Sequence, residues 1–400
     1  MSATARVPGP TSSPWARFDD LRSGTALLFG ATSDTLAAWA PDEVPAVLDR
    51  VQRAADGGAW TFGFVSYEAA AGLDSALPVH DPVDGLPLAW FAISAAPPVT
   101  VPVVGPASAA AVRTAPWRLR WDQDHHRAAV DAVRERIAAG EAYQVNLTTR
   151  TDSTLHGDPF ALYAHLAGTQ HGAHHAYLHT GRFVIAGASP ELFFDLRGRR
   201  IRMRPMKGTA PRGRTAEEDE ALRRQLRSSA KERAENLMIV DLVRNDLSRI
   251  ATTGSVRVTA LFTEERYDTV HQLTSEVTAE LEHGVELTDI FRALFPCGSV
   301  TGAPKQRSMA IIRELEPLPR GVYCGAVGLV APPGAAQRTR FSVAIRTALV
   351  DRRYGRCTYG AGGGITWGSD ADREFDELVT KTRILPTPPH AEPGVLARGA

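Results

Sequence analysis

Residues 122–150 read DQDHHRAAVDAVRERIAAGEAYQVNLTTR, and this stretch changes from one hydrophobic periodicity to another. The apolar residues of its first part, 122–139, fall on one face of a helix: Ala129, Val130, Val133 and Ile137. Gly140 then supplies a typical helix stop. Over 143–150 apolar and polar residues alternate, which predicts a strand with one buried face. The sequence therefore predicts a long helix followed directly by a half-buried strand.

The same two patterns recur on both sides of this stretch, in no regular order. Further strands are predicted at 26–29, 60–65, 183–186, 191–196, 201–206, 323–330, 340–350 and 357–360. Further helices are predicted at 37–55, 228–250, 289–295, 308–315 and 371–382. Because strands and helices do not alternate one by one, the pattern favours a layered α+β fold over a doubly wound sheet.

Segments of biased composition mark the predicted boundaries. The first fifteen residues are rich in Pro, Ser and Thr, and the stretch 96–116 is rich in Pro, Ala and Val. We therefore expect a disordered lead-in at 1–15, an N-terminal subdomain at 16–115, a larger domain at 116–388 and a tail at 389–400.

Composition excludes several classes of protein. The 400 residues include 45 basic and 45 acidic side chains and 44% hydrophobic residues, an ordinary globular balance. A neutral chain without a basic block argues against nucleic-acid binding. The three Cys share no CxxC spacing and form no disulfide framework, which fits a reducing cytoplasm. Because we find neither a secretory signal nor an apolar run of about 18 residues, we expect a soluble cytoplasmic protein that does not enter membranes.

Lysine is rare in this chain. Of the 45 basic residues, 41 are Arg and only four are Lys: Lys207, Lys231, Lys305 and Lys381. An Arg-rich codon bias explains the scarcity, but not why these four remain. Lys207 follows a predicted strand and precedes a Gly, a turn that could aim its amine into a cavity, where a Lys can act as a nucleophile. A surface Lys on a hairpin is the alternative.

Two pairs of glutamates are spaced three residues apart on predicted helices. Glu232 and Glu235 form one pair, and Glu374 and Glu377 form the other. Spacing of three places each pair on one helical face. Two such faces opposed would give an oxygen-rich site suited to Mg²⁺, whereas each pair alone is more typical of a solvated surface.

Two further features could bind an anion. The run at 360–364 reads GAGGG after a predicted strand; its backbone amides could cradle a carboxylate, or it could be a flexible turn. Arg346 is predicted within a strand among apolar neighbours, and a half-buried Arg requires an anionic partner. That partner could belong to the protein or to a ligand.

Longer motifs follow one another through the last two-thirds of the chain. They are GEAYQVNLT at 140–148, ASPELF at 188–193, RPMKGT at 204–209, AENLMIVDLVRND at 234–246, FPCGSVTGAPK at 295–305, RGVYCGAVG at 320–328 and GGGI at 362–365. With these motifs, the chain from about 122 to 385 resembles the chorismate-utilising enzymes, which include anthranilate, isochorismate, salicylate and aminodeoxychorismate synthases. The resemblance implies the fold of anthranilate synthase component I, a two-lobed α+β structure of layered sheets covered by helices.

Three positions separate the branches of this family. Lys207 resembles aminodeoxychorismate synthases, since anthranilate-type members carry Ala there. Gln144 stands where isochorismate- and salicylate-forming members have a Lys that activates water, and Gln272, after His271, stands where anthranilate-type members have His. The resemblance is therefore closest to aminodeoxychorismate synthase component I, which aminates chorismate at C4 for 4-aminobenzoate and folate or a related secondary metabolite. Alternatives are anthranilate or 2-amino-2-deoxyisochorismate synthase component I, or a non-catalytic chorismate-binding subunit.

The resemblance also implies roles for individual residues. Lys207 would attack C2 covalently, and Glu191 would act as the general acid for the departing C4 hydroxyl. Mg²⁺ would be held by Glu235 and Glu377, with Glu232 and Glu374 acting through water. The substrate-binding positions are Tyr323, Arg346, Gly362, Gly363, Lys381, Ser299, Thr209 and Gln144.

The source of ammonia is expected to be a partner. None of the three Cys lies in a glutaminase-type G-x-C-x-G elbow, so the resemblance implies a separate glutamine amidotransferase subunit. Lys305 is expected to pair with the carboxylate cluster and Lys231 to lie on a helix surface. Feedback binding of tryptophan is not predicted.

Overall fold

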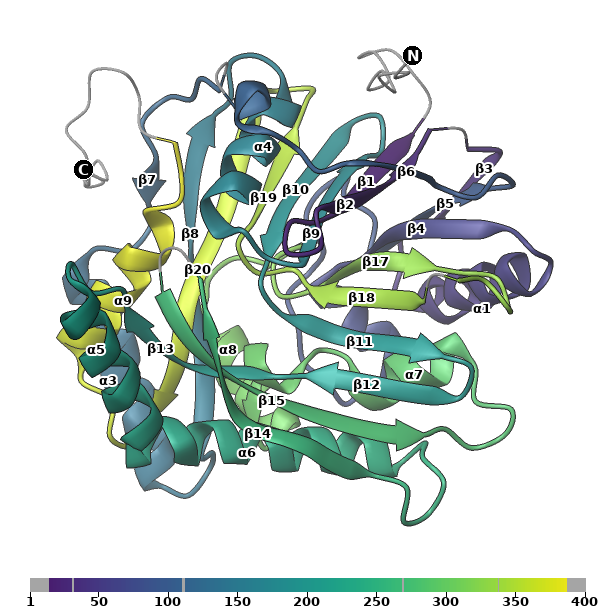
Figure 1. Cartoon of the computed structure of the whole chain (residues 1–400). Coiled ribbons are helices and arrows are strands. Elements are labelled where there is room, and N and C mark those ends of the chain that lie inside the picture. Colours follow the sequence, from purple (N-terminus) through teal and green to yellow (C-terminus); the bar gives the residue numbers. More distant parts are fainter. Residues whose placement is uncertain (1–13, 31, 110–111, 268–269, 337, 387–400) are drawn as a thin grey trace.

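The protein is described here as a computed structural model, which covers residues 14–30, 32–109, 112–267, 270–336 and 338–386. Within these residues, two sheets of ten strands each face one another, and helices cover their outer faces (Figure 1). Neighbouring strands in both sheets run antiparallel. The predicted α+β class with layered sheets covered by helices is confirmed.

The first sheet has the order β16-β8-β20-β19-β10-β9-β1-β2-β6, and β7 pairs with β8. Its strands are β16 (Gly302–Ala303), β8 (Gln144–Thr154), β20 (Arg356–Thr366), β19 (Thr347–Asp351), β10 (Phe183–Ser189), β9 (His174–His179), β1 (Trp15–Asp20), β2 (Thr25–Phe29), β6 (Val99–Pro102) and β7 (Arg118–Leu119). The predicted strand at 143–150 is the first part of β8, which pairs along its whole length with β20.

The second sheet has the order β13-β15-β12-β11-β18-β17-β4-β5-β3, and β14 pairs with β15. Its strands are β13 (Met206–Pro211), β15 (Val270–Glu280), β12 (Arg200–Arg204), β11 (Leu192–Arg197), β18 (Thr339–Val343), β17 (Ala326–Val330), β4 (Trp60–Val65), β5 (Ala89–Ser94), β3 (Asp34–Ala38) and β14 (Arg257–Arg266). β13 therefore lies at one end of this sheet, as β8 and β20 lie near one end of the other.

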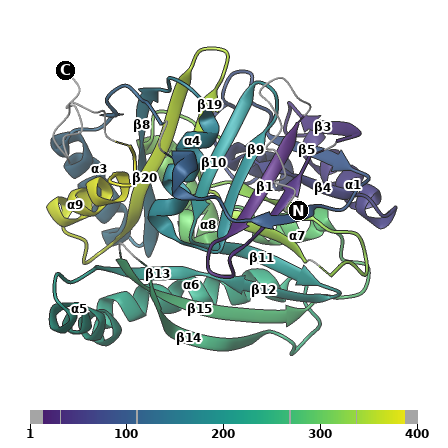
Figure 2. The same cartoon turned by 45° about the horizontal axis from the view of Figure 1, so that its top comes forward.

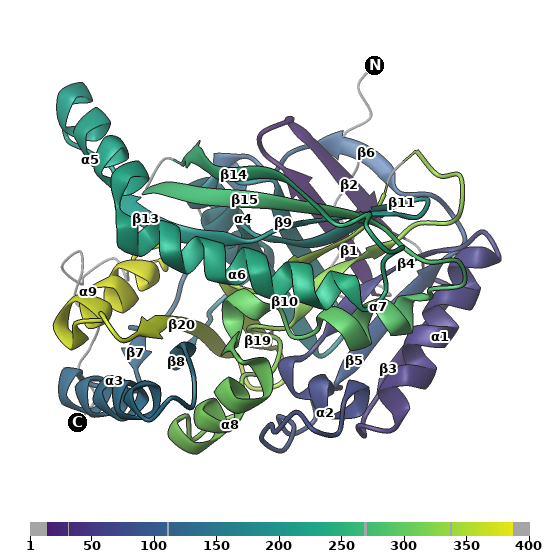
Figure 3. The ribbon, with the colours of Figure 1, turned by 90° about the horizontal axis from the view of Figure 1, so that it is seen from below.

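The helices pack mainly against the outer faces of the sheets. They are α1 (Glu43–Asp56), α2 (Ala70–Leu73), α3 (Gln123–Ala138), α4 (Pro159–Gln170), α5 (Ala216–Ser228), α6 (Ala230–Ser248), α7 (Leu287–Leu294), α8 (Lys305–Leu315) and α9 (Ala371–Thr382). Seen from below, α6, α7 and α1 cross the second sheet (Figure 3), and α4 covers β10 of the first sheet (Figure 2).

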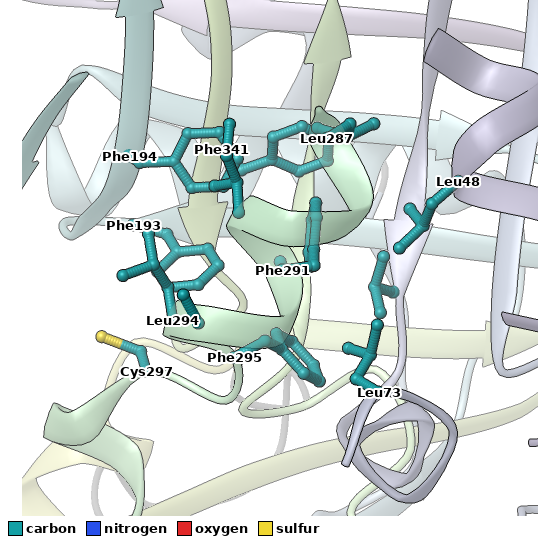
Figure 4. Close-up of a cluster of buried hydrophobic side chains, with 14 of the residues drawn as sticks. Leu48, Leu73, Phe193, Phe194, Leu287, Phe291, Leu294, Phe295, Cys297 and Phe341 are labelled. Atoms are coloured by element: carbon teal, nitrogen blue, oxygen red, sulfur yellow. The ribbon is translucent and has the colours of Figure 1, made fainter. Parts of the chain in front are cut away.

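Aromatic side chains fill the core on both faces of the second sheet. On its outer face, Phe291 of α7 packs edge-on against Phe341 of β18, with ring centroids 5.1 Å apart (Figure 4). Between the sheets, Phe29 of the first sheet contacts Phe62 of the second, with ring centroids 5.1 Å apart. Burying such side chains supplies most of the driving force for packing the layers.

The predicted boundary near residue 115 does not separate the two sheets. The N-terminal strands β1, β2 and β6 belong to the first sheet, whereas β3, β4 and β5 belong to the second. The division into a subdomain at 16–115 and a domain at 116–388 stays a prediction. Trp15, which was predicted as part of the disordered lead-in, is buried in β1. Residues 1–13 and the predicted tail at 389–400 lie outside the described residues.

The structure corrects two other predictions of local structure. The segment predicted as a helix at 37–55 begins with the end of β3, and α1 starts only at Glu43, because Ala37 and Ala38 pair with β5. Several elements were not predicted, among them α4, α5, β5, β9, β14 and β15, and β15 is the strand that joins β12, β13 and β14. In the part of the chain described, every helix is too short or too polar to cross a bilayer.

Candidate active site

A cavity of about 130 Å³ lies where β13 and β20 meet α6 and α9. Of the residues predicted for the site, those that line it are Glu191, Lys207, Thr209, Glu232, Glu235, Ser299, Tyr323, Arg346, Gly362, Gly363, Glu374, Glu377 and Lys381. Gln144 is the exception, since it is fully buried and does not line the cavity. The structure thus gathers residues that are up to 190 positions apart in the sequence, while their roles stay predictions.

Lys207 lies in a β-bulge of β13. The pairing of β13 with β15 shifts register between Met206 and Thr209, which leaves Lys207 and Gly208 out of the regular ladder. Gly208 has a φ of +96°, a conformation that glycine adopts without strain. Asn236 of α6 donates from Nδ2 to the Lys207 carbonyl at 3.3 Å. Bulges redirect side chains, and this bulge turns the Lys207 amine toward the cavity.

Gln144 and Lys207 both lie against Gly364 of β20. A Cβ placed on Gly364 would be 2.5 Å from Lys207 Nζ and 2.6 Å from Gln144 Nε2. Gln144 is fully buried, and neither atom of its amide has a hydrogen-bond partner within the described residues. A buried amide without partners is costly, and this one lies beside Lys207 at Gly364.

Glu191 is buried in the turn between β10 and β11. Ser299 donates from Oγ to Glu191 Oε1 at 2.7 Å, and the Cys297 thiol contacts the same oxygen at 3.8 Å. Burial raises the pKa of Glu191 to about 7, although the Ser299 hydroxyl and the Lys207 amine both favour its ionised form. A carboxyl group with a pKa near 7 can donate a proton near neutral pH.

Two helix starts place the glutamate pairs at the cavity. Ser229 caps α6 by accepting from the Glu232 amide, and the Asp370 side chain caps α9. Because the pairs lie within the first two turns, both helices present their carboxylates to the same space. The four residues are Glu232, Glu235, Glu374 and Glu377.

Lysines hold this carboxylate cluster together. Lys231 Nζ lies 3.9 Å from Glu235 Oε1 and 3.7 Å from Glu374 Oε1, so it bridges α6 and α9. Lys381 Nζ lies 2.6 Å from Glu377 Oε1 and also donates to the Gly362 carbonyl at 2.6 Å. Lys231 was expected on a helix surface; it is half exposed, but it lines the cavity.

The carboxylates affect one another through space. Burial, followed by the charge of Glu235, raises the pKa of Glu232 to about 7. Burial also raises the pKa of Glu374, whereas the Lys381 ammonium lowers the pKa of Glu377. A bound cation would relieve this repulsion between the carboxylates.

The donor set fits Mg²⁺ in its chemistry. Mg²⁺ prefers carboxylate oxygens and water, and the glutamates of α6 and α9 offer only oxygen. Across the described residues, no three His, Cys, Asp or Glu side chains are already gathered in a metal-binding arrangement. Lys231 and Lys381 instead supply the positive charge between the carboxylates.

Arg346 and Tyr323 line the same cavity from segments outside α6 and α9. Arg346 was predicted within a strand, but it lies between β18 and β19 with a φ of +52°, a strained conformation for a residue other than glycine. Its Nε is buried and has no hydrogen-bond partner among the described residues. The Tyr323 ring packs on Gly360, where a Cβ would lie 2.3 Å from it. A buried guanidinium N–H without a partner is suited to an anionic ligand.

Neighbouring residues His271 and Gln272 point to opposite sides of β15. The His271 ring contacts Asp219 Oδ1 at 2.8 Å, away from the cavity. Gln272 lines the cavity and donates from Nε2 to Thr209 Oγ1 at 3.4 Å. The imidazole is therefore not available to a bound ligand in this arrangement.

One prediction about lysine is wrong. Lys305 was expected to pair with the carboxylate cluster, but it donates to Asp246 Oδ2 at 2.9 Å and to the Leu294 carbonyl at 3.1 Å. It does not line the cavity. Its role is to connect α8 with the C-terminal part of α6 and the end of α7.

Two polar groups behind the site were missed from the sequence. Asn236 supports the Lys207 bulge, and its position four residues after Glu232 on the same helical face was the available signal. Cys297 contacts Glu191 and Ser299. Nothing in its spacing distinguished it from a core residue.

The fold and the cavity together define a candidate enzyme site. The sequence profile of one family, described as chorismate binding enzyme, matches residues 104–386. The match covers more than half of the chain, and the protein therefore belongs to the family of chorismate-utilising enzymes.

Relatives within this family carry two different names. The chain is 44% identical over 273 residues to an aminodeoxychorismate synthase from Streptomyces griseus, covering 68% of this chain and 37% of that protein. It is 45% identical over 260 residues to an anthranilate synthase component 1 from Streptomyces coelicolor, covering 64% and 50%. The match thus spans half or less of either relative's length.

A solved structure agrees on the fold. Anthranilate synthase component I from Streptococcus pneumoniae TIGR4 superposes with a TM-score of 0.74 at 24% identity, covering 96% of this chain and 95% of that one. At this identity the likeness supports the fold alone, and it confirms the predicted anthranilate synthase component I-like architecture.

Proposed function

We propose that this protein is aminodeoxychorismate synthase component I, which converts chorismate and ammonia to 4-amino-4-deoxychorismate. The observation that carries the proposal is the Lys207 amine, which the β13 bulge directs into a cavity that also contains the buried carboxyl of Glu191. A nucleophile and an acid of suitable pKa then face the same substrate.

The charge of the cavity suits a dianionic substrate only with an added cation. Its lining carries five carboxylates, those of Glu191 and the four helix glutamates, and four cations, those of Arg346 and three lysines. The formal net charge is therefore −1 when all are ionised. Chorismate carries two carboxylates, and bound Mg²⁺ would neutralise and orient one of them. We propose that Glu235 and Glu377 hold this ion, with Glu232 and Glu374 around it.

The other carboxylate of chorismate would bind on the opposite side. We propose that Arg346, whose Nε lacks a hydrogen-bond partner among the described residues, and Tyr323 hold it, and that Gly362 and Gly363 leave room beside Lys381 for the first one. This orientation brings the ring of the substrate over Lys207.

In the proposed reaction, Lys207 forms a bond to C2 as the ring double bonds shift and the C4–oxygen bond breaks. Glu191 gives its proton to the departing hydroxyl, which leaves as water. Ammonia then forms a bond to C4, the double bonds shift back and the C2–nitrogen bond to Lys207 breaks, which restores the free amine. The proton that the new C4 ammonium group loses returns to Glu191. The enolpyruvyl group is retained, and the sum is chorismate plus ammonia giving 4-amino-4-deoxychorismate plus water.

Two observations favour amination at C4 over amination at C2. Lys207 occupies the bulge where anthranilate-type members carry Ala, and Gln272 rather than His271 lines the cavity. The alternative remains anthranilate or 2-amino-2-deoxyisochorismate synthase component I, since one relative of similar identity is named anthranilate synthase component 1. We further propose a glutamine amidotransferase subunit as the source of ammonia and the cytoplasm as the location.

Product analysis tests the proposal. Purified protein is incubated with chorismate, Mg²⁺ and ammonium, and the product is identified by mass spectrometry and NMR. We expect nitrogen at C4 with the enolpyruvyl group retained. An aromatic product formed with release of pyruvate, or nitrogen at C2, would contradict it. Chorismate binding without turnover would instead indicate a non-catalytic subunit.

A further inference from the structure

Three buried side chains form a small polar triangle at the acid side of the cavity. Ser299 Oγ lies 2.7 Å from Glu191 Oε1 and 3.3 Å from Cys297 Sγ, and Cys297 Sγ lies 3.8 Å from the same Glu191 oxygen. All three side chains are at most 5% exposed. Their hydrogen bonds therefore depend on one another rather than on solvent.

Cys297 lies on the border between the hydrophobic core and the site. It belongs to the aromatic cluster around Phe291, and Figure 4 shows its sulfur at the edge of that cluster, pointing away from the rings. Ser299 follows two residues later in the short helical turn Gly298–Val300. The thiol is thus anchored by the core on one side and offered to Ser299 and Glu191 on the other.

We propose that Cys297 is a positioning residue, whose thiol keeps Ser299 and Glu191 hydrogen-bonded in both protonation states of the acid. This inference rests on the acid role given to Glu191 in the proposed function. It assigns a task to a side chain that does not itself line the cavity.

The Cys297 thiol has opposite hydrogen-bonding roles in the ionised and the protonated state of Glu191. When Glu191 is ionised, the Ser299 hydroxyl and the Cys297 thiol both donate to Oε1. When Glu191 is protonated and donates to Ser299 Oγ, the single hydroxyl proton of Ser299 turns to Cys297 Sγ, which accepts it. A thiol can do both because it is a weak donor and a weak acceptor. An alanine would leave Ser299 with one partner instead of two.

The thiol fulfils this role without adding a charge. Burial raises the pKa of Cys297 to about 12, so it stays protonated while Glu191 titrates. Among the described residues, the charged side chains that act on this triangle are Lys207 from β13, which favours the ionised form of Glu191, and Lys305 from α8, which acts on Cys297. Neither belongs to the turn that carries the thiol.

The first test is the pH profile of kcat/KM for chorismate. A general acid must be protonated, so activity falls as pH rises through the pKa of Glu191. Bonds to the ionised carboxylate are the stronger ones, so losing the thiol donor raises this pKa. In Cys297→Ala we expect the falling limb to move to higher pH by about 0.3 to 1 pH unit, and in Cys297→Ser to return toward the wild-type position.

Two controls separate positioning from a general effect on the fold. Cys357→Ala removes another buried thiol, on β20 and outside the cavity, and should leave the limb in place. In a Ser299→Ala background, Cys297→Ala should shift the limb less, because part of its effect passes through Ser299. An unshifted limb in Cys297→Ala, or an equal shift in Cys357→Ala, would overturn the proposal.

A second measurement keeps the proposal testable if Cys297→Ala does not fold. In a Cys324→Ala/Cys357→Ala protein, the S–H stretching band in the infrared reports Cys297 alone. We expect this band to shift with pH at the midpoint of the Glu191 titration, and a band that stays constant from pH 5 to 9 would overturn the proposal. Because this readout needs no turnover, it is independent of whether amination at C4 is found.

Discussion

The two sides of the cavity hold their charges in different ways. On the sheet side, Glu191, Ser299 and Gln144 are buried with few partners, and burial sets the pKa of the acid. On the helix side, Lys231 bridges Glu235 of α6 and Glu374 of α9, and Lys381 pairs with Glu377 within α9. Desolvation adjusts the reactivity of a group, whereas pairing provides binding. Under the proposed function, we expect the chemical step on the sheet side and binding of the metal-bound carboxylate on the helix side.

The largest expected effect on activity comes from removing the Lys207 amine on the sheet side. Lys207→Ala should lower C4 amination by at least about 10³-fold, because a covalent step loses its nucleophile. Chorismate binding, measured by calorimetry with Mg²⁺, should change little. Lys231→Ala removes a lysine of the same cavity from the helix side and should retain C4 amination. Undiminished amination in Lys207→Ala would exclude covalent catalysis.

A change on the helix side should act on binding instead. In Glu377→Gln we expect the apparent affinities for Mg²⁺ and for chorismate to fall together by about 10- to 100-fold, because one ion serves both. Asp376→Asn is the matched control, since this exposed neighbour on α9 does not line the cavity. Titrations of activity with Mg²⁺ and with chorismate give both values. A normal Mg²⁺ titration in Glu377→Gln would show that this residue is not a ligand.

The sequence predicted which residues line the two sides of the cavity better than it predicted how they are arranged. Periodicity identified the helices that carry the glutamates, and motif resemblance identified Lys207 and Glu191, because those residue types determine the chemistry. Neither periodicity nor resemblance could predict the register shift of β13 or the positive φ of Arg346, because both depend on pairing between distant strands. Lys305 was assigned to the wrong carboxylate for the same reason: its partner Asp246 is 59 residues away.

Contacts between residues far apart in the sequence also limited the prediction of the fold. The strand at 60–65 and the helix at 371–382 were predicted within one residue of the observed elements, since each shows a clear local period. β15 was missed, although it pairs with three other strands, because its polar residues Gln272, Thr274 and Ser275 are buried by partners that only the folded chain supplies.

The smallest expected effects come from substitutions of two glycines of β20, Gly363 and Gly364. A Cβ on Gly364 would meet Lys207 Nζ at 2.5 Å, whereas a Cβ on Gly363 would meet Glu374 Oε2 at 3.3 Å and Lys381 Nζ at 3.6 Å. The Gly363 contacts are with the ends of flexible side chains, so Gly363→Ala should keep a thermal midpoint close to that of wild type. A Cβ on Gly364 also meets the buried Gln144 Nε2 at 2.6 Å, so we expect a lower midpoint for Gly364→Ala. Displacing a reacting group by about 1 Å can cost about 100-fold in rate.

Gly364→Ala should therefore lower kcat by about 10- to 100-fold with little change in the KM for chorismate, because it displaces the amine of the sheet side. Gly363→Ala should mainly raise that KM, and by less, because it moves side chains that bind. Gly368→Ala, where a Cβ meets nothing within 4 Å, is the control for adding a methyl group nearby. If both variants changed only KM, the division between a reacting side and a binding side would be wrong, since the methyl group that faces Lys207 would then act no differently from the one that faces Glu374.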